Sequence, residues 1–187
     1  MPQKKLLLDS NSYFRLAKSI HPLLDVIFGD ENYCLYVLKE LDGEYDKNSL
    51  LRKKFSWVED DEYFDNRKKR ISVSRAEKKD IDLTVDYLVN YKVVNGLGVS
   101  KIDIKCLAQG YVQNIPVVTD DQDMLELAKS FYIVTMTTLE LMSLMHESGH
   151  ITMGKVGEIV AYWEYVDDKP ANFRKDYKKL FGKYNKP

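Results

Sequence analysis

Short apolar runs alternate along this chain with segments of helical pattern, and this alternation limits the fold more than any other feature. The runs that predict strands cover residues 6–8, 33–37, 115–118 and 132–136. A run without polar residues is typical of a strand buried on both faces, and alternation with helices is typical of a parallel sheet. The sequence therefore predicts an α/β fold with three layers, α/β/α, around a central and mostly parallel sheet.

Capping signals indicate where the helices begin. Ser74 and Glu77 form an S-x-x-E capping box, and apolar residues then recur with helical spacing until Gly96. Ser100 is placed to cap the next helix, whose first turn would contain Asp103. Further helices are expected over residues 10–20, 38–43, 121–128, 138–147 and 152–165.

Length and charge limit the organisation of the chain. With 187 residues and 44% hydrophobic content, residues 1–187 are expected to form a single domain. Residues 44–73 are less regular and carry runs of both charges, which indicates an insertion or a mobile arm. Because 28 basic residues are balanced by 29 acidic ones, nucleic-acid binding would have to be local.

The cysteines and the apolar segments indicate the compartment. Cys34 and Cys106 both lie in apolar stretches and form neither a disulfide framework nor a zinc motif, so we expect two buried thiols in a reducing environment. The amino terminus has too short an apolar core for a signal peptide, and no segment reaches the length of a membrane span. A cytoplasmic protein without a membrane partner is expected.

Four acidic residues carry the chemistry that the sequence suggests. Asp9, Glu40 and Asp121 follow the first three apolar runs, and Asp103 opens a helix. Ligands bind outside the carboxyl ends of strands in open α/β sheets, so these side chains could converge there. Carboxylates suit Mg²⁺ or Mn²⁺, which can activate water and stabilise the leaving oxygen of a phosphodiester. Singly, three of these acids are equally well explained as helix caps; the ordered set favours a metal site.

The segments LLLDSN, VLKEL, GLGVSKIDIKCLA and IPVVTDDQDMLELA resemble, in order and approximate spacing, the motifs of the PIN-domain family. This family of small α/β nucleases includes the toxin-type ribonucleases of toxin–antitoxin pairs. The resemblance implies a PIN-like fold for the whole chain, an RNA substrate and an antitoxin partner. It places the catalytic and metal-binding role on Asp9, Glu40, Asp103 and Asp121, with Asp123 as an additional metal ligand. Asn11 and Thr119 would be their polar neighbours, and Glu44 is an alternative to Glu40.

The resemblance thus predicts a divalent-metal-dependent endoribonuclease, in the role of a toxin. The alternative is a catalytically inactive PIN-like scaffold that binds RNA or protein. Residues 44–73 make the chain longer than compact toxin-type members, and the basic residues of this segment are candidates for phosphate binding, with a solvated arm as the alternative. They are Arg52, Lys53, Lys54, Arg67, Lys68, Lys69 and Arg70.

Two further features leave alternatives open. Residues 146–150 satisfy the H-E-x-x-H pattern of zinc proteases, which would make the protein a zinc hydrolase using His146 and His150. Gly149 instead indicates a helix end between the two histidines, which favours a plain helix terminus. Tyr162, Trp163 and nearby aromatic residues indicate either core packing or the interface of a homodimer.

Overall fold

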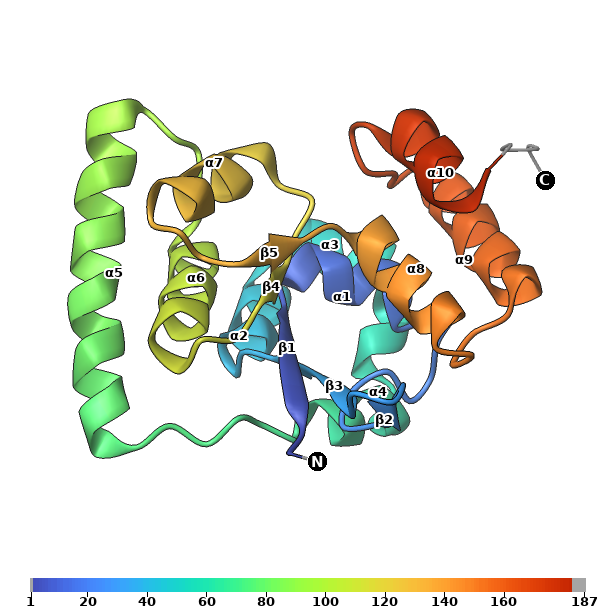
Figure 1. Ribbon diagram of the computed structural model, residues 1–187, viewed down its shortest axis with the longest axis horizontal. Coiled ribbons are helices and arrows are strands. Elements are labelled where there is room, and N and C mark those ends of the chain that lie inside the picture. The colour runs from blue at the N-terminus through green and yellow to red at the C-terminus, as the bar shows by residue number, and fades with distance from the viewer. Residues whose placement is uncertain (1, 183–187) are drawn as a thin grey trace.

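A five-stranded sheet in the order β2-β3-β1-β4-β5 forms the centre of the computed structural model, which describes residues 2–182 (Figure 1). The strands are β1 (Lys4–Leu8), β2 (Ile27–Phe28), β3 (Tyr33–Val37), β4 (Val117–Val118) and β5 (Thr135–Met136). Strands β3, β1, β4 and β5 run parallel, and β2 pairs with β3 in the antiparallel sense. The predicted mostly parallel sheet is confirmed.

Helices cover both faces of this sheet. They are α1 (Ser10–Leu16), α2 (Glu40–Lys47), α3 (Ser49–Lys54), α4 (Asp61–Arg67), α5 (Arg75–Asn95), α6 (Lys101–Gln113), α7 (Gln122–Ser130), α8 (Thr138–Glu147), α9 (Met153–Tyr165) and α10 (Phe173–Phe181), with a 3-10 turn, η1 (Ser56–Glu59). Figure 1 shows α5, α6 and α7 on one side of the strands and α1, α8, α9 and α10 on the other. The fold is therefore a three-layer α/β/α arrangement.

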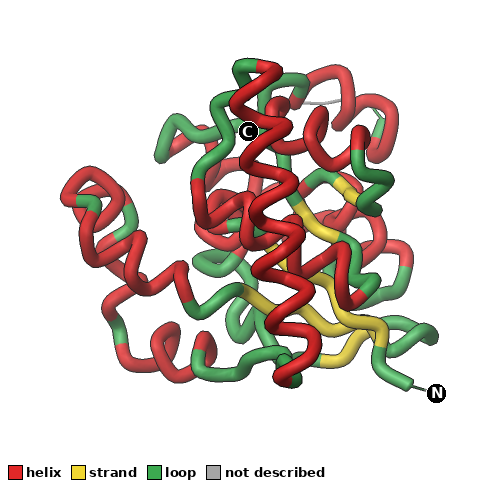
Figure 2. Tube along the Cα trace, turned by 90° about the vertical axis from the view of Figure 1, so that its left-hand side faces the viewer, coloured by secondary structure: helices red, strands yellow, loops and turns green. Residues whose placement is uncertain are grey.

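The central strand explains why two layers of helices are needed. Successive side chains of a strand point to opposite faces, so Leu6 and Leu8 enter one core and Leu7 enters the other. The first core contains Phe14 of α1 and residues of α8, α9 and α10. The second lies beneath α6, α7 and the long helix α5, which stands in front of the strands in Figure 2. Because β1 is buried on both faces, residue 9, which follows this strand directly, lies in the middle of the protein.

The capping signals gave correct helix starts. Ser74 accepts a hydrogen bond from the backbone N–H of Glu77, and Glu77 accepts one from the backbone N–H of Ser74. Helix α5 ends at Gly96, whose φ of +68° is a left-handed conformation that suits glycine. Asp103 occupies the third position of α6, in the same kind of box with Ser100.

Several boundaries differ from the prediction. Strands β4 and β5 comprise only the last two residues of the runs 115–118 and 132–136. For β4, the preceding Pro116 has no N–H to donate to a ladder. Helix α2 does not end near Gly43 but continues to Lys47. The short edge strand β2 was not predicted.

Of the two alternatives predicted for residues 44–73, an insertion or a mobile arm, the mobile arm was wrong. This segment contains α3, η1 and α4, and its buried residues Phe55, Trp57, Val58 and Tyr63 belong to the first core. Helices this short give no clear period in the sequence, and the charged runs obscured the apolar residues between them. The segment is thus helical and packed; its status as an insertion stays a prediction.

Cys34 and Cys106 are both buried free thiols, as expected. Within residues 2–182, no helix combines the length and apolar character that a membrane span requires.

Candidate functional site

The carboxyl ends of three neighbouring strands lie level with one another. Leu8 at the end of β1 pairs with Val37 of β3 and with Val118 of β4. The residue that follows β1 is Asp9, whose backbone N–H donates to the carbonyl of Val118 at 3.0 Å. The sheet therefore delivers Asp9 to the central position of its carboxyl edge, where the sequence predicted a site.

Asp9 is a buried carboxylate held by two donors. Its side chain is at the N-cap of α1, where Oδ1 accepts from the backbone N–H of Ser12 at 2.6 Å. Oδ2 accepts from the Thr119 hydroxyl at 2.5 Å. Burial raises the pKa of Asp9 to about 6, although the hydrogen bonds from Thr119 and Ser12 act in the opposite direction. Each oxygen keeps a second lone pair, so the carboxylate can still bind a cation.

Asp103 shares a small cavity with Asp9. The cavity has a volume of about 10 Å³, close to the minimum for one water molecule or one small ion. It is lined by Leu8, Asp9, Ser10, Leu38, Leu41, Ile102, Asp103 and Cys106. Burial, and then the charges of Asp9 and Asp103, raise the pKa of the Cys106 thiol well above its usual value. Both acids therefore act on the same buried space, which we call the acidic cavity.

Asp121 is linked to Asp9 through Thr119. It caps α7 by accepting from the backbone N–H of Met124 at 2.8 Å, and its own N–H donates to the Thr119 hydroxyl oxygen at 3.2 Å. Thr119, itself fully buried, thus connects the loops that follow β1 and β4. These contacts place Thr119 beside both Asp9 and Asp121.

Asp123 and Asn11 lie with Asp121 around a separate, open surface hollow. Asp123 accepts from the backbone N–H of Gly98 at 2.6 Å, which fastens the loop between α5 and α6 to α7. A Cβ at position 98 would lie 2.8 Å from the Asp123 carboxylate, so a larger residue there would force this carboxylate to move. The contact gives Asp123 a structural task besides its predicted metal binding.

The two glutamates on α2 face different surroundings. Glu40 forms an ion pair with Lys105 of α6 and lines a different pocket from the acidic cavity. Glu44 accepts from the Ser10 hydroxyl at 2.5 Å, and Ser10 lines the acidic cavity. Of the two alternatives that the sequence left open, Glu44 is therefore the one connected to Asp9 and Asp103.

The donor set can be tested against the predicted metal. Over residues 2–182, no three His, Cys, Asp or Glu side chains are grouped so that they could hold a metal ion. The structure brings Asp9 and Asp103 to one cavity and links Asp121 to Asp9, but it does not gather all four predicted acids. Mg²⁺ commonly uses one or two carboxylates and completes its shell with water and substrate phosphates. Two carboxylates beside an ion-sized space fit such a cation.

Comparisons with known proteins give no family. No family model matches the chain, and no curated protein matches it. Among solved structures, the crystal structure of FitAcB from Neisseria gonorrhoeae is similar, with 13% identity and a TM-score of 0.44, over 71% of this chain and 97% of that one. A likeness this distant carries no conclusion about this protein.

The predicted phosphate-binding residues divide into two groups. Arg67 was predicted wrongly, because its side chain is only 4% exposed. It donates to Asp42 at 2.8 Å, to the Tyr13 hydroxyl at 3.1 Å and to the Val58 carbonyl at 3.0 Å. These contacts fasten α4 to the core. The other members reach the surface, and their phosphate contacts stay predictions: Arg52, Lys53, Lys54, Lys68, Lys69 and Arg70.

The zinc-hydrolase interpretation is wrong. Helix α8 ends at Glu147, and Gly149 follows with φ of +72°, so the two histidines do not share a continuous helix. Nδ1 of His146 lies 3.2 Å from the carbonyl of Ile151, while the ring of His150 stacks on Phe28. Burial lowers the pKa of His150. The pattern marks a helix terminus, as its glycine indicated.

Sequence reasoning missed the charged residues around Glu40. Lys39 and Lys105 had no assigned role, yet both line the pocket beside the acidic cavity. The available signal was the position of Lys39, two residues after the second apolar run.

Proposed function

We propose that this protein is a divalent-metal-dependent nuclease that hydrolyses phosphodiester bonds of RNA. The observation that carries the proposal is the acidic cavity, in which Asp9 at the end of the central strand meets Asp103 of α6. Asp9 and Asp103 would hold Mg²⁺ or Mn²⁺, which when bound activates water and stabilises the leaving oxygen. The RNA substrate is supported by the motif resemblance.

The chain's own residues prepare this site. Thr119 fixes the orientation of the Asp9 carboxylate, and Ser12 holds its other oxygen. Asp121 stands one hydrogen bond beyond Thr119 and would act from the open side of the same strand edge. Glu44, through Ser10, would add negative charge near the cavity. The carboxylate of Asp9 must lose its proton to bind a cation, so activity would rise as the pH passes about 6.

The motif resemblance also supports the role of a toxin with an antitoxin partner. Expression of the protein alone should then stop growth, and co-expression of the protein encoded beside it should restore growth. Growth that stays normal on expression of active wild-type protein would contradict this role without touching the catalytic proposal.

The catalytic proposal is tested with purified protein and labelled single-stranded RNA. Wild type should cleave the RNA with Mn²⁺ and not with EDTA. Asp9→Asn and Asp103→Asn should each lower the rate by more than about 100-fold, since even polar neighbours of metal ligands contribute 10–100-fold. Cleavage that persists in both variants would end the proposal.

A matched control separates the metal role of Asp103 from its cap. Glu140 holds the same third position in a capping box with Thr137 at the start of α8, away from the acidic cavity. Glu140→Gln should weaken its helix start as Asp103→Asn does and leave cleavage unchanged. Equal losses in the two variants would reduce Asp103 to a capping residue.

The second candidate is a scaffold that binds RNA or protein without catalysis. It is favoured by one observation: no three acidic or other metal-binding side chains form a group in residues 2–182. RNA binding with no saturable Mn²⁺ site in calorimetry would support this candidate against the first.

A further inference from the structure

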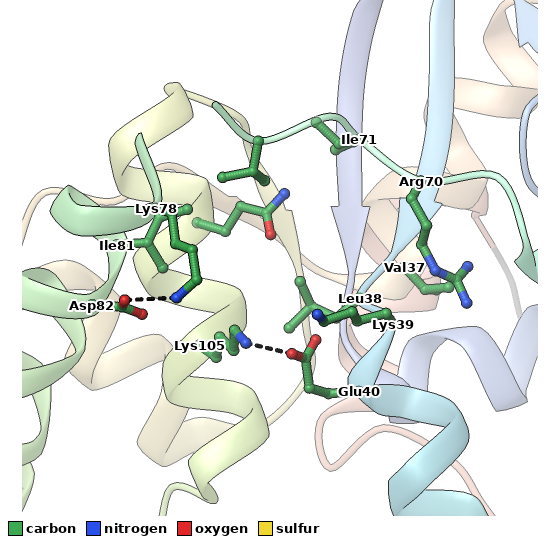
Figure 3. A pocket seen from close by; sticks show the side chains of 12 residues that line it. Val37, Leu38, Lys39, Glu40, Arg70, Ile71, Lys78, Ile81, Asp82 and Lys105 are labelled. Carbon is green, nitrogen blue, oxygen red and sulfur yellow. Dashed lines mark hydrogen bonds and ion pairs between the residues drawn. The ribbon is translucent and has the colours of Figure 1, made fainter. Parts of the chain in front are cut away.

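A larger pocket adjoins the acidic cavity, with which it shares Leu38. Figure 3 shows the side chains that line this larger pocket. Its volume is about 250 Å³, and Leu38 lines both hollows. Helix α6 separates them, because Asp103 lines the acidic cavity and Lys105 lines the larger pocket. We call the larger one the cationic pocket. It is lined by Val37, Leu38, Lys39, Glu40, Arg70, Ile71, Val73, Lys78, Ile81, Asp82, Lys105 and Gln109.

Four cations from four separate parts of the chain meet around this pocket, against two acids. Lys39 precedes α2, Arg70 follows α4, Lys78 lies on α5 and Lys105 lies on α6. Figure 3 shows Lys105 reaching toward Glu40 and Lys78 reaching toward Asp82. The lining therefore carries an excess of positive charge, although the chain as a whole has a net charge of −1.

The cations differ in how firmly they are held. Arg70 pairs with Asp42 at 3.0 Å, and Lys78 pairs with Asp82 at 2.8 Å. Within residues 2–182, Lys39 has no acidic partner inside ion-pair distance. An entering anion could therefore be bound by Lys39 directly and by Lys105 in place of Glu40.

The rest of the lining is apolar. Val37, Leu38, Ile71 and Ile81 are all buried core residues whose side chains form part of the pocket wall. Gln109 adds one buried amide, whose nitrogen donates to Gln113 at 2.9 Å. An apolar wall beside cationic side chains suits a ligand that carries both a flat organic ring and an anionic group. The volume lies just below the usual range of about 300–1,000 Å³ for small-molecule pockets, so it suits one small unit.

We propose that the cationic pocket binds one nucleotide of the RNA substrate, next to the bond that is cut, with its phosphate on Lys39 and Lys105. The identity of the substrate as RNA rests on the proposed function. The pocket and its charges are features of the structure and do not depend on that function. The base and ribose lie against the apolar wall. The phosphate displaces Glu40 from Lys105, so Glu40 competes with the substrate instead of binding the metal.

The test measures binding without cleavage. A short labelled single-stranded RNA is titrated with each protein in EDTA, and binding is followed by fluorescence anisotropy. Lys39→Ala and Lys105→Ala should each weaken binding about tenfold, the usual loss for one charged hydrogen bond to phosphate. Glu40→Gln should tighten binding, because it removes the competing carboxylate.

Matched controls decide whether RNA binding depends on the pocket or on the general positive charge of surface lysines. Lys101 lies one turn before Lys105 on α6, and Lys47 lies at the far end of α2 from Lys39; neither lines the pocket. Lys101→Ala and Lys47→Ala should leave the affinity unchanged. Equal losses in pocket and control variants would overturn the inference, as would displacement of the RNA by a polyglutamate peptide at the same concentration as by unlabelled RNA. Thermal melting of each variant confirms that it is folded.

Failure of this inference can be told apart from failure of the proposed function. RNA that binds through Lys39 and Lys105 in EDTA but is never cut with Mn²⁺ would leave the pocket in place and remove the nuclease. Metal-dependent cleavage whose KM is unchanged in Lys105→Ala would leave the nuclease in place and overturn the pocket assignment.

Discussion

An acidic residue follows each of the strands β1 and β3, so the two acids have similar positions in the sequence. In the folded protein their surroundings differ. Asp9 follows β1 directly, is buried, and enters the acidic cavity with Asp103. Glu40 lies on the first turn of α2 after β3, and its side chain pairs with Lys105 in the cationic pocket. Position near a strand end is therefore not enough to assign a metal ligand. The partners that the folded chain supplies decide between a carboxylate available to a cation and one already neutralised by a lysine.

The largest expected effect separates these two acids in a single assay. Asp9→Asn should reduce Mn²⁺-dependent cleavage by more than about 100-fold, since it removes a proposed ligand, whereas Glu40→Gln should change the rate by less than about fivefold. Initial rates at saturating RNA would measure both. If Glu40→Gln lost as much activity as Asp9→Asn, the distinction between the two strand ends would be wrong.

Stability in the absence of metal should also respond to Asp9. In the folded state the pKa of this carboxyl is about 6, while the ordinary pKa of an aspartate is 3.8, so the folded state binds more protons between these values. The contribution of Asp9 to the free energy of unfolding should therefore fall as the pH rises from about 4 to about 6, by about 3 kcal/mol, and stay level above that.

Asp9→Asn should abolish this decrease, because asparagine does not titrate and still caps a helix well. Denaturant unfolding of both proteins in EDTA at several pH values would measure the difference. The variant should have a larger free energy of unfolding than wild type at pH 7.5 and a similar one near pH 4. If the free energy of unfolding changed with pH in the same way for both proteins, burial of the ionised Asp9 would not destabilise the fold.

Removal of the Thr119 hydroxyl, which connects the loops after β1 and β4, should have a smaller effect on the rate of cleavage. Thr119→Val keeps the shape but removes the donor to Asp9 and the acceptor for the Asp121 N–H. The rate of cleavage should fall by about 10-fold to 100-fold, as for other groups that orient metal ligands. Thr84→Val is a suitable control on the exposed part of α5, where the hydroxyl donates only to the Asp80 carbonyl. Wild-type rates in Thr119→Val would show that Asp9 needs no such support.

The parts of the fold that were predicted are those with local causes. The boxes at Ser74 and Ser100 involve side chains and backbone only three residues away, so the sequence contains the whole signal. Strand length depends on pairing with distant residues, and β4 is as short as its ladder with β1 and β5. The helices between residues 44 and 73 depend on the burial of Phe55 and Trp57 in a core that is built from other segments.

The same reasoning applies to the candidate site. Asp9 and Asp103 were found because a strand end and a helix cap are visible in the sequence. The pairing of Glu40 with Lys105 was not, because it joins residues 65 positions apart on two helices that meet only in the folded protein. Residues two apart on a helix do not face each other. For that reason α6 presents Asp103 to the acidic cavity and Lys105 to the cationic pocket.

The smallest expected effect concerns the stability of the Glu40–Lys105 pair. The two side chains are 23% and 37% exposed, so solvent screens much of their attraction. Lys105→Gln should lower the free energy of unfolding by less than about 1 kcal/mol, which is typical of exposed ion pairs. Urea unfolding at pH 7.5 would measure it, with the exposed pair Lys78–Asp82 and the variant Lys78→Gln as the reference. A loss several times larger would mean that the pair stabilises the junction of α2 and α6, and that RNA could not displace Glu40 from Lys105 without disturbing the fold.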